Sequence, residues 1–251
     1  MNPRNCILTN QIRHRFRGFL PVVVDIETAG IIPHKNALLE MCVVLLQLDE
    51  DGLFRVGERH FEHILPFENA ELDAKSLEFN QIDPYQPLRF AIDEKLALER
   101  LFSPIQQALK DSKCQRAVLV GHNAWFDLLF IKEAVKRTGI KSPFHDFTCF
   151  DTATLGGLFY GQTVLAKAAL AAKISGFTCN IARKTGEKDK LFGSVTAGDI
   201  ADALKAGGIE VEKRSIHVKD AIKALGVHNV EIKLLPEVST TLKVWVVKEN
   251  A

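Results

Sequence analysis

The sequence is poor in the residues that build disulfide or zinc scaffolds. Its 251 residues hold an odd number of cysteines, and no two of them stand at the spacing of a zinc finger (Cys6, Cys42, Cys114, Cys149 and Cys179). This pattern argues against a disulfide framework and against a zinc ribbon. We therefore expect reduced thiols and a cytoplasmic location.

Long apolar runs and an excess of one charge are also missing. No uninterrupted apolar run approaches the roughly 18–20 residues that a membrane helix needs, and the basic stretch at residues 13–17 does not fit a signal-peptide core. Lys and Arg number 32 against 31 Asp and Glu, which excludes a polybasic binder that acts through its overall field. We expect no membrane partner, although local charged patches stay possible.

Phenylalanine is scarce in the last third of the chain. Fourteen of the 16 Phe residues precede Gly176, and the net charge changes from −1 over residues 1–176 to +2 over residues 177–251. Together with the hydrophobic patterns, these differences predict a junction near residues 175–176. The predicted domains are residues 1–175 and residues 176–251.

The first segment has the pattern of a mixed α/β domain. Runs rich in β-branched residues predict buried strands, and apolar residues at helical spacing predict amphipathic helices. The expected strands cover residues 20–26, 38–48, 60–65, 117–120 and 148–151, and the expected helices cover residues 93–110, 124–137 and an Ala/Leu-rich stretch that ends at 173.

The second segment predicts a compact α+β module of about 75 residues. Thr196 is a candidate N-cap for a helix that ends before Gly207 and Gly208. The expected strands cover residues 177–183, 209–211, 230–235 and 241–247, and a polar turn is expected at residues 184–190.

Three carboxylates of the first segment are candidate catalytic residues. Asp25 and Glu27 end the first strand, and alternation sends both side chains to the same side. Asp127 lies one turn into a helix that follows another core strand. Clustered carboxylates favour a hard divalent cation. The alternative is a chance pair of acids and an acid placed for the helix dipole.

Several separated motifs occur in an order that resembles the DEDD 3′→5′ exonucleases, in particular their bacterial ribonuclease T group. The motifs are residues 25–30, 79–84, 122–127, 147–152 and 161–165. The resemblance covers about residues 10–174. It implies a ribonuclease H-like sheet flanked by helices, and here the fold stops before its last helix.

The resemblance also implies a chemistry. In that family four acids bind two Mg²⁺ ions and a histidine assists the attacking water, so Asp25, Glu27 and Asp127 would be catalytic metal ligands. Phe79, Phe126 and Phe147 would stack on the terminal bases of a nucleic acid. For each Phe the alternative is core packing, and Ile31 stands where relatives carry a further Phe.

Basic residues near the N-terminus are candidate phosphate contacts. Arg13 and Arg15, interleaved with aromatic residues, would bind the nucleic-acid backbone. The resemblance implies a homodimer in which basic residues of one subunit serve the active site of the other. The alternative is a solvated N-terminal arm.

The third motif of the family is absent. It consists of His, four residues, and the fourth Asp, but only His217 and His228 follow residue 145, and Ile222 and Lys233 stand five residues after them. The general base and one metal ligand are therefore missing. Asp151 occupies a different place in the motif order, at a strand end, and we expect it to be structural.

The second segment resembles the C-terminal domain of ribosomal protein nine of the bacterial large subunit. The resemblance covers residues 177–251 and is carried by residues 190–196, 199–201, 222–226 and 236–239. It implies binding to large-subunit rRNA.

Three functions remain open from the sequence. The first is a 3′→5′ exoribonuclease that trims the 3′ ends of tRNA and other stable RNAs, with activity reduced or lost through its incomplete site. The second is a non-enzymatic protein that binds rRNA or the ribosome. The third is a recombined chain without a joint function.

Overall fold

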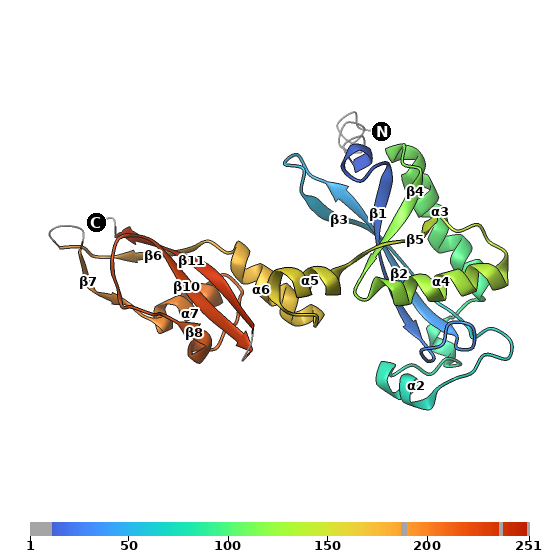
Figure 1. Ribbon diagram of the computed structural model, residues 1–251. Helices are drawn as coiled ribbons and strands as arrows, with labels where there is room; N and C mark the ends of the chain where they lie inside the picture. Colours follow the sequence, from blue (N-terminus) through green and yellow to red (C-terminus); the bar gives the residue numbers. More distant parts are fainter. Residues whose placement is uncertain (1–11, 187–189, 236–237, 250–251) are drawn as a thin grey trace. The chain divides into compact units, whose positions relative to one another are not determined.

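The computed structural model describes residues 12–186, 190–235 and 238–249, so that Cys6 lies outside the described residues. The chain divides into two compact units, Met1–Thr152 and Ala153–Ala251 (Figure 1). The four cysteines that the structure describes are all free. None of the helices formed by described residues is both long and apolar enough to cross a membrane.

The first unit is built on a five-stranded mixed sheet. β1 pairs with β2 in antiparallel and with β4 in parallel orientation, and the outer strands continue these two patterns. This arrangement confirms the predicted α/β fold of the ribonuclease H-like type. In spatial order the strands are β3 (Phe54–His63), β2 (Leu38–Leu48), β1 (Phe19–Thr28), β4 (Arg116–Gly121) and β5 (Phe144–Asp151).

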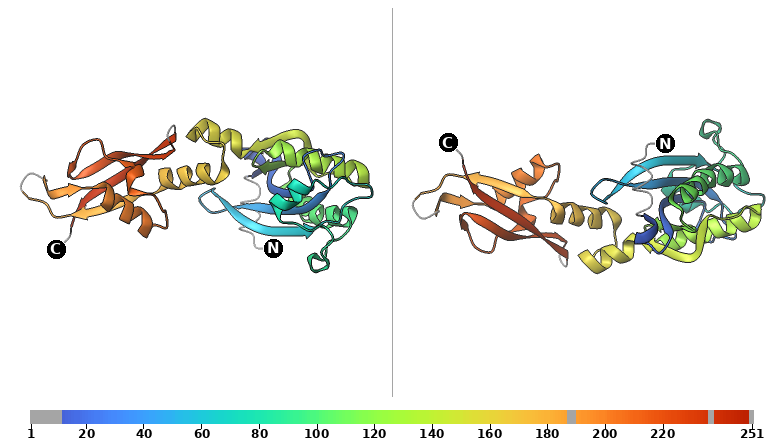
Figure 2. Two further views of the ribbon diagram at one scale, coloured as in Figure 1. Left: turned by 90° about the horizontal axis from the view of Figure 1, so that it is seen from below. Right: turned by 90° about the horizontal axis from the view of Figure 1, so that it is seen from above.

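Two helices, α3 (Glu94–Ser112) and α4 (Ala124–Thr138), pack against each other and against this sheet (Figures 1 and 2). Alternate residues of β1 contribute to the core under them, namely Leu20, Val22, Val24 and Ile26. The side chains of the residues between them point to the opposite face of the sheet. The alternation therefore keeps Asp25 and Glu27 out of the core.

Two local expectations for the first unit need correction. The third strand was expected at residues 60–65 but spans Phe54–His63, because its first half is mostly exposed and lacks a buried apolar run. The short helix α2 (Ala74–Asn80) was not predicted. It has no buried residue, so no apolar periodicity marks it. A one-turn 3₁₀ helix, η1 (Pro87–Arg89), follows it.

The second unit begins with two helices and continues as an α+β module. α5 (Thr152–Tyr160) leads from the first unit, and α6 (Leu165–Gly176) follows it. β6 (Cys179–Arg183), β11 (Val238–Lys248), β10 (Gly226–Leu235) and β8 (Ile216–His217) form one sheet in that order, and β7 (Lys190–Val195) pairs with β9 (Ile222–Ala224). α7 (Ala197–Ala206) begins at the predicted cap, Thr196, which forms a capping box with Asp199. A 3₁₀ helix, η3 (Lys213–Ser215), precedes β8.

One predicted strand of the second unit is wrong. Residues 209–211 form no strand, although Ile209 is buried. Ile209 packs into the core directly after the helix end at Gly207 and Gly208. Its apolar character therefore reflects core packing and not pairing with a neighbouring strand.

The spatial division of the chain lies earlier than the predicted boundary at residues 175–176. Ile174 of α6 is fully buried in the core of the second unit, together with Val244 and Val246 of β11. α6 is therefore a structural part of the second unit.

Candidate active site

The three predicted carboxylates come from one strand of the sheet and from the helix that follows the neighbouring strand. Asp25 and Glu27 lie at the end of β1, and Asp127 lies in the first turn of α4, which follows β4. β4 approaches β1 closely at Gly121, where a Cβ atom would stand 3.2 Å from the carbonyl oxygen of Val24. The missing side chain lets the helix begin beside the acids of β1.

The electrostatics show that these carboxylates face one another. Burial, and after it the charges of Asp25 and Glu27, raise the pKa of Asp127 to about 7. Burial, followed by the charges of Asp25 and Glu40, also raises the pKa of Glu27. Burial alone raises the pKa of Asp25. The site therefore holds more negative charge than it can stabilise unaided, and a bound cation would relieve this.

The carboxylates suit a hard divalent cation in charge and in donor type. They do not form a complete ligand cage: among the described residues, no three His, Cys, Asp or Glu side chains are arranged to hold a metal ion. The residues present fit one ion completed by water or phosphate oxygens better than the two-ion arrangement implied by the family resemblance.

Asp151 holds the start of α4 in place. Its Oδ1 accepts hydrogen bonds from the backbone N–H groups of Asn123 (2.7 Å) and Ala124 (3.3 Å). The side chain of Asn123 makes no capping bond of its own. Asp151 therefore caps the helix that carries Asp127, which is the structural role expected from the sequence.

The next residue strengthens the same junction. The Thr152 hydroxyl donates to the carbonyl oxygen of Gly121 (3.0 Å) and also lies 3.0 Å from Nδ1 of His122. The end of β5 thus ties the turn after β4 to the edge of the sheet. His122 takes part in this turn and does not occupy the place of a free general base.

The turn after β1 needs its glycine. Gly30 has a φ of +154°, and a Cβ atom there would stand 2.3 Å from Cγ of Asn36. Asn36 is buried and fastens the turn, since its Oδ1 accepts from the backbone of Ile32 (2.8 Å) and its Nδ2 donates to the carbonyl of Glu71 (2.8 Å). These hydrogen bonds fix the backbone of the turn that follows Glu27.

A pocket of about 310 Å³ is lined by two of the predicted aromatic residues and by one of the acids, Glu27. Phe79 of α2 and Phe126 of α4 line it together with Glu27. Phe79 is 87% exposed, whereas Phe126 is partly buried and rests on Phe130 with 4.9 Å between ring centroids. An exposed ring and a supported ring that line one pocket with a candidate catalytic acid form an arrangement that can accept a planar base.

Phe147 and the two predicted arginines do not line this pocket. Phe147 is 81% exposed and lies edge-on to His145. Arg13 is exposed. The Arg15 guanidinium donates to the carbonyl of Gly52 (2.9 Å) and lies 4.9 Å from the centre of the Phe54 ring. Their roles in binding nucleic acid remain predictions.

A second, basic pocket was missed by sequence reasoning. It measures about 470 Å³ and gathers Lys110 of α3, Arg116 of β4 and Lys141 of the segment before β5, and the described residues that line it include no acid. The three cations come from separate elements, so no run of basic residues announces them. Such a group can bind phosphates.

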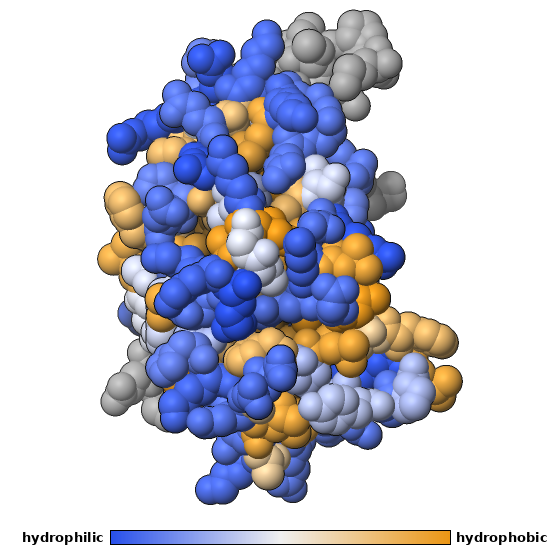
Figure 3. All heavy atoms as spheres, turned by 90° about the vertical axis from the view of Figure 1, so that its right-hand side faces the viewer, coloured by the Kyte–Doolittle hydropathy of each residue, from blue (hydrophilic) through white to orange (hydrophobic). Residues whose placement is uncertain are grey.

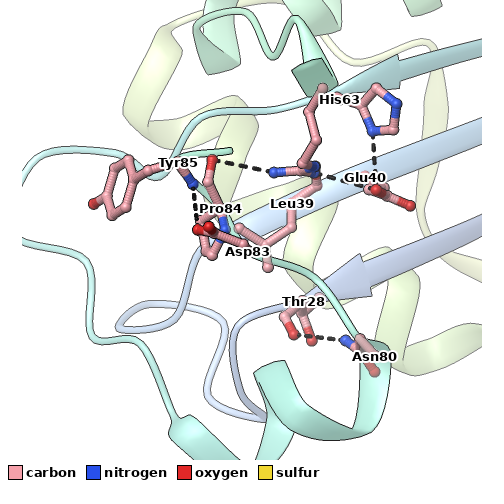
Figure 4. Close-up of polar contacts among 9 residues, drawn as sticks. Thr28, Leu39, Glu40, His63, Asn80, Asp83, Pro84 and Tyr85 are labelled. Atoms are coloured by element: carbon pink, nitrogen blue, oxygen red, sulfur yellow. Dashed lines mark hydrogen bonds and ion pairs between the residues drawn. The ribbon is translucent and has the colours of Figure 1, made fainter. Parts of the chain in front are cut away.

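A polar network beside Glu27 was also missed. Glu40 of β2 stands directly opposite Glu27 in the ladder, and its Oε1 lies 2.9 Å from Nδ1 of His63 and 3.2 Å from an Arg89 guanidinium nitrogen (Figure 4). Arg89 also donates to the carbonyl oxygens of Pro84 and Leu39. The network balances the charge of Glu40 next to the candidate site.

The outer surface is otherwise mixed in character. The face drawn in Figure 3 is largely hydrophilic, with smaller hydrophobic patches between the polar side chains. Large apolar side chains that are more than two-thirds exposed include Leu88 and Phe90 at η1, Leu158 and Phe159 of α5, and Phe192 of β7.

Comparison with protein families gives two matches. The model of the family described as "Exonuclease" matches residues 22–178. The model described as "Ribosomal protein L9, C-terminal domain" matches residues 166–248. The second match begins within α6, which agrees with the packing of that helix in the second unit.

Similar proteins carry the name ribonuclease T. The one from Marinobacter nauticus is 56% identical over 161 residues, which cover 64% of this chain and 73% of that protein. The one from Wigglesworthia glossinidia brevipalpis is 41% identical over 207 residues, which cover 82% and 96%. A solved structure of E. coli Exonuclease I with a dT13 oligonucleotide aligns with a TM-score of 0.44 and 17% identity, over 78% of this chain and 37% of that one.

Proposed function

The chain belongs to the exonuclease family that includes the ribonucleases T, and from this premise we propose that its first unit binds single-stranded RNA 3′ ends and removes terminal nucleotides slowly. The observation that carries the proposal is the pocket in which Phe79 and Phe126 meet Glu27. Base stacking there would bring the last phosphodiester of a strand to the three carboxylates. The fold and the relatives support this assignment of substrate class.

Each part of the site has a task in this proposal. Phe79 and Phe126 would hold the terminal base by stacking, which tolerates every sequence because each base has a π-face. Asp25, Glu27 and Asp127 would each offer carboxylate oxygens to a divalent cation, for which we propose Mg²⁺ and whose other ligands would be water and phosphate oxygens. When bound, such an ion supplies charge stabilisation for the phosphodiester and activation of the attacking water.

The missing third motif sets the expected rate. Loss of a general base typically lowers a rate by roughly 10²–10⁴-fold, and the absent fourth carboxylate removes a ligand as well. His122 is held in the turn after β4. We therefore propose a slow enzyme that keeps the binding properties of the family, with the 3′ ends of tRNA and other stable RNAs as substrates.

The basic pocket is a candidate contact for parts of the strand that lie away from the acids. Lys110, Arg116 and Lys141 would contact backbone phosphates away from the acids, in addition to the predicted contacts of Arg13 and Arg15. Such contacts carry no sequence information but raise affinity in a salt-dependent way.

Digestion of a 3′-tailed single-stranded RNA tests the proposal. We expect shortening from the 3′ end that requires Mg²⁺, is about 10²–10⁴-fold slower than with the Marinobacter ribonuclease T in parallel, and disappears in Asp25→Asn. Asp146→Asn, which alters an exposed acid of β5, should digest like the unaltered protein. Turnover equal to that of the relative would contradict the slow enzyme, and equal digestion by Asp25→Asn would assign the activity elsewhere.

The second unit supports a second candidate function, binding to large-subunit rRNA. The match of residues 166–248 to the C-terminal domain of ribosomal protein L9 favours it. We expect the unaltered full chain and its Asp25→Asn variant to co-sediment equally well with large ribosomal subunits at low salt. Failure of both proteins to co-sediment would contradict this function without affecting the nuclease.

A further inference from the structure

Glu27 has an acidic neighbour on the next strand. Glu40 of β2 lies directly opposite Glu27 of β1 in the antiparallel ladder. Directly opposed residues point to the same face of a sheet, with their Cβ atoms about 4.5–5.5 Å apart. Burial, and then the charges of Asp25 and Glu40, raise the pKa of Glu27. A cation bound at Glu27 therefore lies within reach of the charge of Glu40.

One oxygen of Glu40 is already engaged by two basic side chains. Its Oε1 lies 3.2 Å from a guanidinium nitrogen of Arg89 and 2.9 Å from Nδ1 of His63 (Figure 4). The side chains of Arg89 and Glu40 are only 11% and 20% exposed. Partly buried charges are screened much less by salt than exposed ones. Arg89 therefore opposes the charge of Glu40 at close range.

The guanidinium of Arg89 is held in place by the backbone around it. It also donates to the carbonyl oxygens of Leu39 (2.9 Å) and Pro84 (3.2 Å). Its Nε atom is buried and has no hydrogen-bond partner within the described part of the chain. A buried donor without a partner lowers the stability of a fold. Hydrogen bonding alone therefore does not explain the position of the guanidinium, which points to its charge.

We propose that Arg89 and Glu40 are positioning residues that set how tightly the three carboxylates hold a divalent cation. This inference rests on the proposed function, which gives Asp25, Glu27 and Asp127 that cation. Glu40 adds negative charge beside the ligands and raises their affinity for the cation. Arg89 opposes this charge and keeps Glu40 from turning toward the ion. The pair thereby leaves the remaining coordination positions of the ion to water and to the phosphate of the strand.

The two charges predict opposite effects on the affinity for a cation. Arg89→Met removes the positive charge and keeps an apolar stem, so we expect tighter cation binding. Glu40→Gln removes the negative charge and keeps an oxygen that can accept from Arg89, so we expect weaker binding. In the double variant both charges are absent, and we expect the affinity to return to that of the unaltered protein. A loss of local structure would instead weaken binding in every variant.

Titration with Mn²⁺ tests the inference without RNA and without turnover. Mn²⁺ takes oxygen ligands as Mg²⁺ does, and electron paramagnetic resonance counts the free ion. The full chain is titrated at pH 8, above the pKa of about 7 of Asp127. We expect the Kd to be about 3- to 10-fold lower in Arg89→Met and about 3- to 10-fold higher in Glu40→Gln, as one charge a few ångströms away gives in a hydrated site. The double variant should lie within about 2-fold of the unaltered protein, because the two effects offset each other.

Arg100 and Glu62 form the matched control pair. Their charged atoms lie 3.4 Å apart, and Glu62 stands opposite Met41, whose side chain is buried in the core under the helices. Arg100→Met and Glu62→Gln should therefore leave the Kd for Mn²⁺ unchanged. Arg89→Lys keeps the positive charge and should also keep the Kd of the unaltered protein.

The possible outcomes separate the inference from the proposed function. Weaker binding in both Arg89→Met and Glu40→Gln, or one Kd for all variants, would overturn the inference and leave the cation site in place. Absence of Mn²⁺ binding to the unaltered protein, or binding of equal affinity by Asp25→Asn, would overturn both. If urea unfolding shows that Arg89→Met does not fold, the double variant must still bind more tightly than Glu40→Gln, and the reverse would contradict the role of Arg89.

Discussion

At the scale of single residues, Asp127 illustrates the electrostatic cost of the candidate site. It is 5% exposed, and burial together with Asp25 and Glu27 raises its pKa from 3.8 to about 7. A raised pKa means that the folded chain binds this proton more tightly than the unfolded chain does. The stability that Asp127 contributes in its neutral form is therefore present below pH 4 and lost as the pH rises to about 7.

We expect Asp127→Asn to stabilise the metal-free first unit above pH 7 and to have little effect near pH 4. The shift in pKa corresponds to a gain of up to about 4 kcal/mol in the free energy of unfolding. Urea unfolding in EDTA at pH 4 and pH 8, followed by the fluorescence of Trp125, measures both values. A gain at pH 4 as large as at pH 8 would contradict this account of the site.

At the scale of elements, the end of β5 determines where α4 begins. Asp151 supplies the cap that Asn123 does not, and α4 carries both Asp127 and Phe126. We expect Asp151→Ala to lower the stability of the first unit by about 0.5–2 kcal/mol, the usual loss for a helix cap, and to weaken RNA binding. Asp146→Ala, on the same strand but exposed, should change neither. Unaltered urea unfolding of Asp151→Ala would refute the capping role.

The elements also show how far sequence patterns reach. β1 and α4 were predicted because their buried faces repeat at strand and helix spacing, and the acids followed from the alternation along β1. α2 was not predicted, since it buries no residue and its place is set by hydrogen bonds such as that from Asn80 to Thr28. The sequence therefore identified Phe79 as a candidate, but not the pocket that it lines with Glu27.

The basic pocket marks a different limit of sequence reasoning. Lys110, Arg116 and Lys141 line one pocket because the end of α3, the start of β4 and the segment before β5 come together there. Neither a charge run nor a periodic pattern connects them. By contrast, the missing third motif could be recognised from the sequence alone, because its residue types and spacing are fixed.

At the scale of the whole molecule, α6 lies where the matches to two protein families overlap. The exonuclease match runs to residue 178 and the ribosomal-protein match begins at residue 166, so α6 belongs to both in sequence. In the structure its residue Ile174 is fully buried in the core of the second unit. Sequence comparison therefore cannot assign α6 to one domain, whereas packing does.

This assignment predicts which unit a core substitution in α6 destabilises. Loss of a buried Ile side chain typically costs about 2–5 kcal/mol, so Ile174→Ala should lower the urea midpoint of the second unit. Trp125 lies in the first unit and Trp245 in the second, and the chain has no other Trp. Single Trp→Phe variants therefore allow fluorescence to follow each unit separately.

We expect Ile174→Ala to shift the transition reported by Trp245 and to leave that of Trp125 in place. Ile131→Ala is the matched control, because Ile131 is equally buried in the core of the first unit and should give the reverse pattern. If Ile174→Ala shifted only the Trp125 transition, α6 would have to be assigned to the exonuclease domain, as the predicted boundary at residues 175–176 implies. The packing of Ile174 against the sheet that contains β11 favours the first outcome.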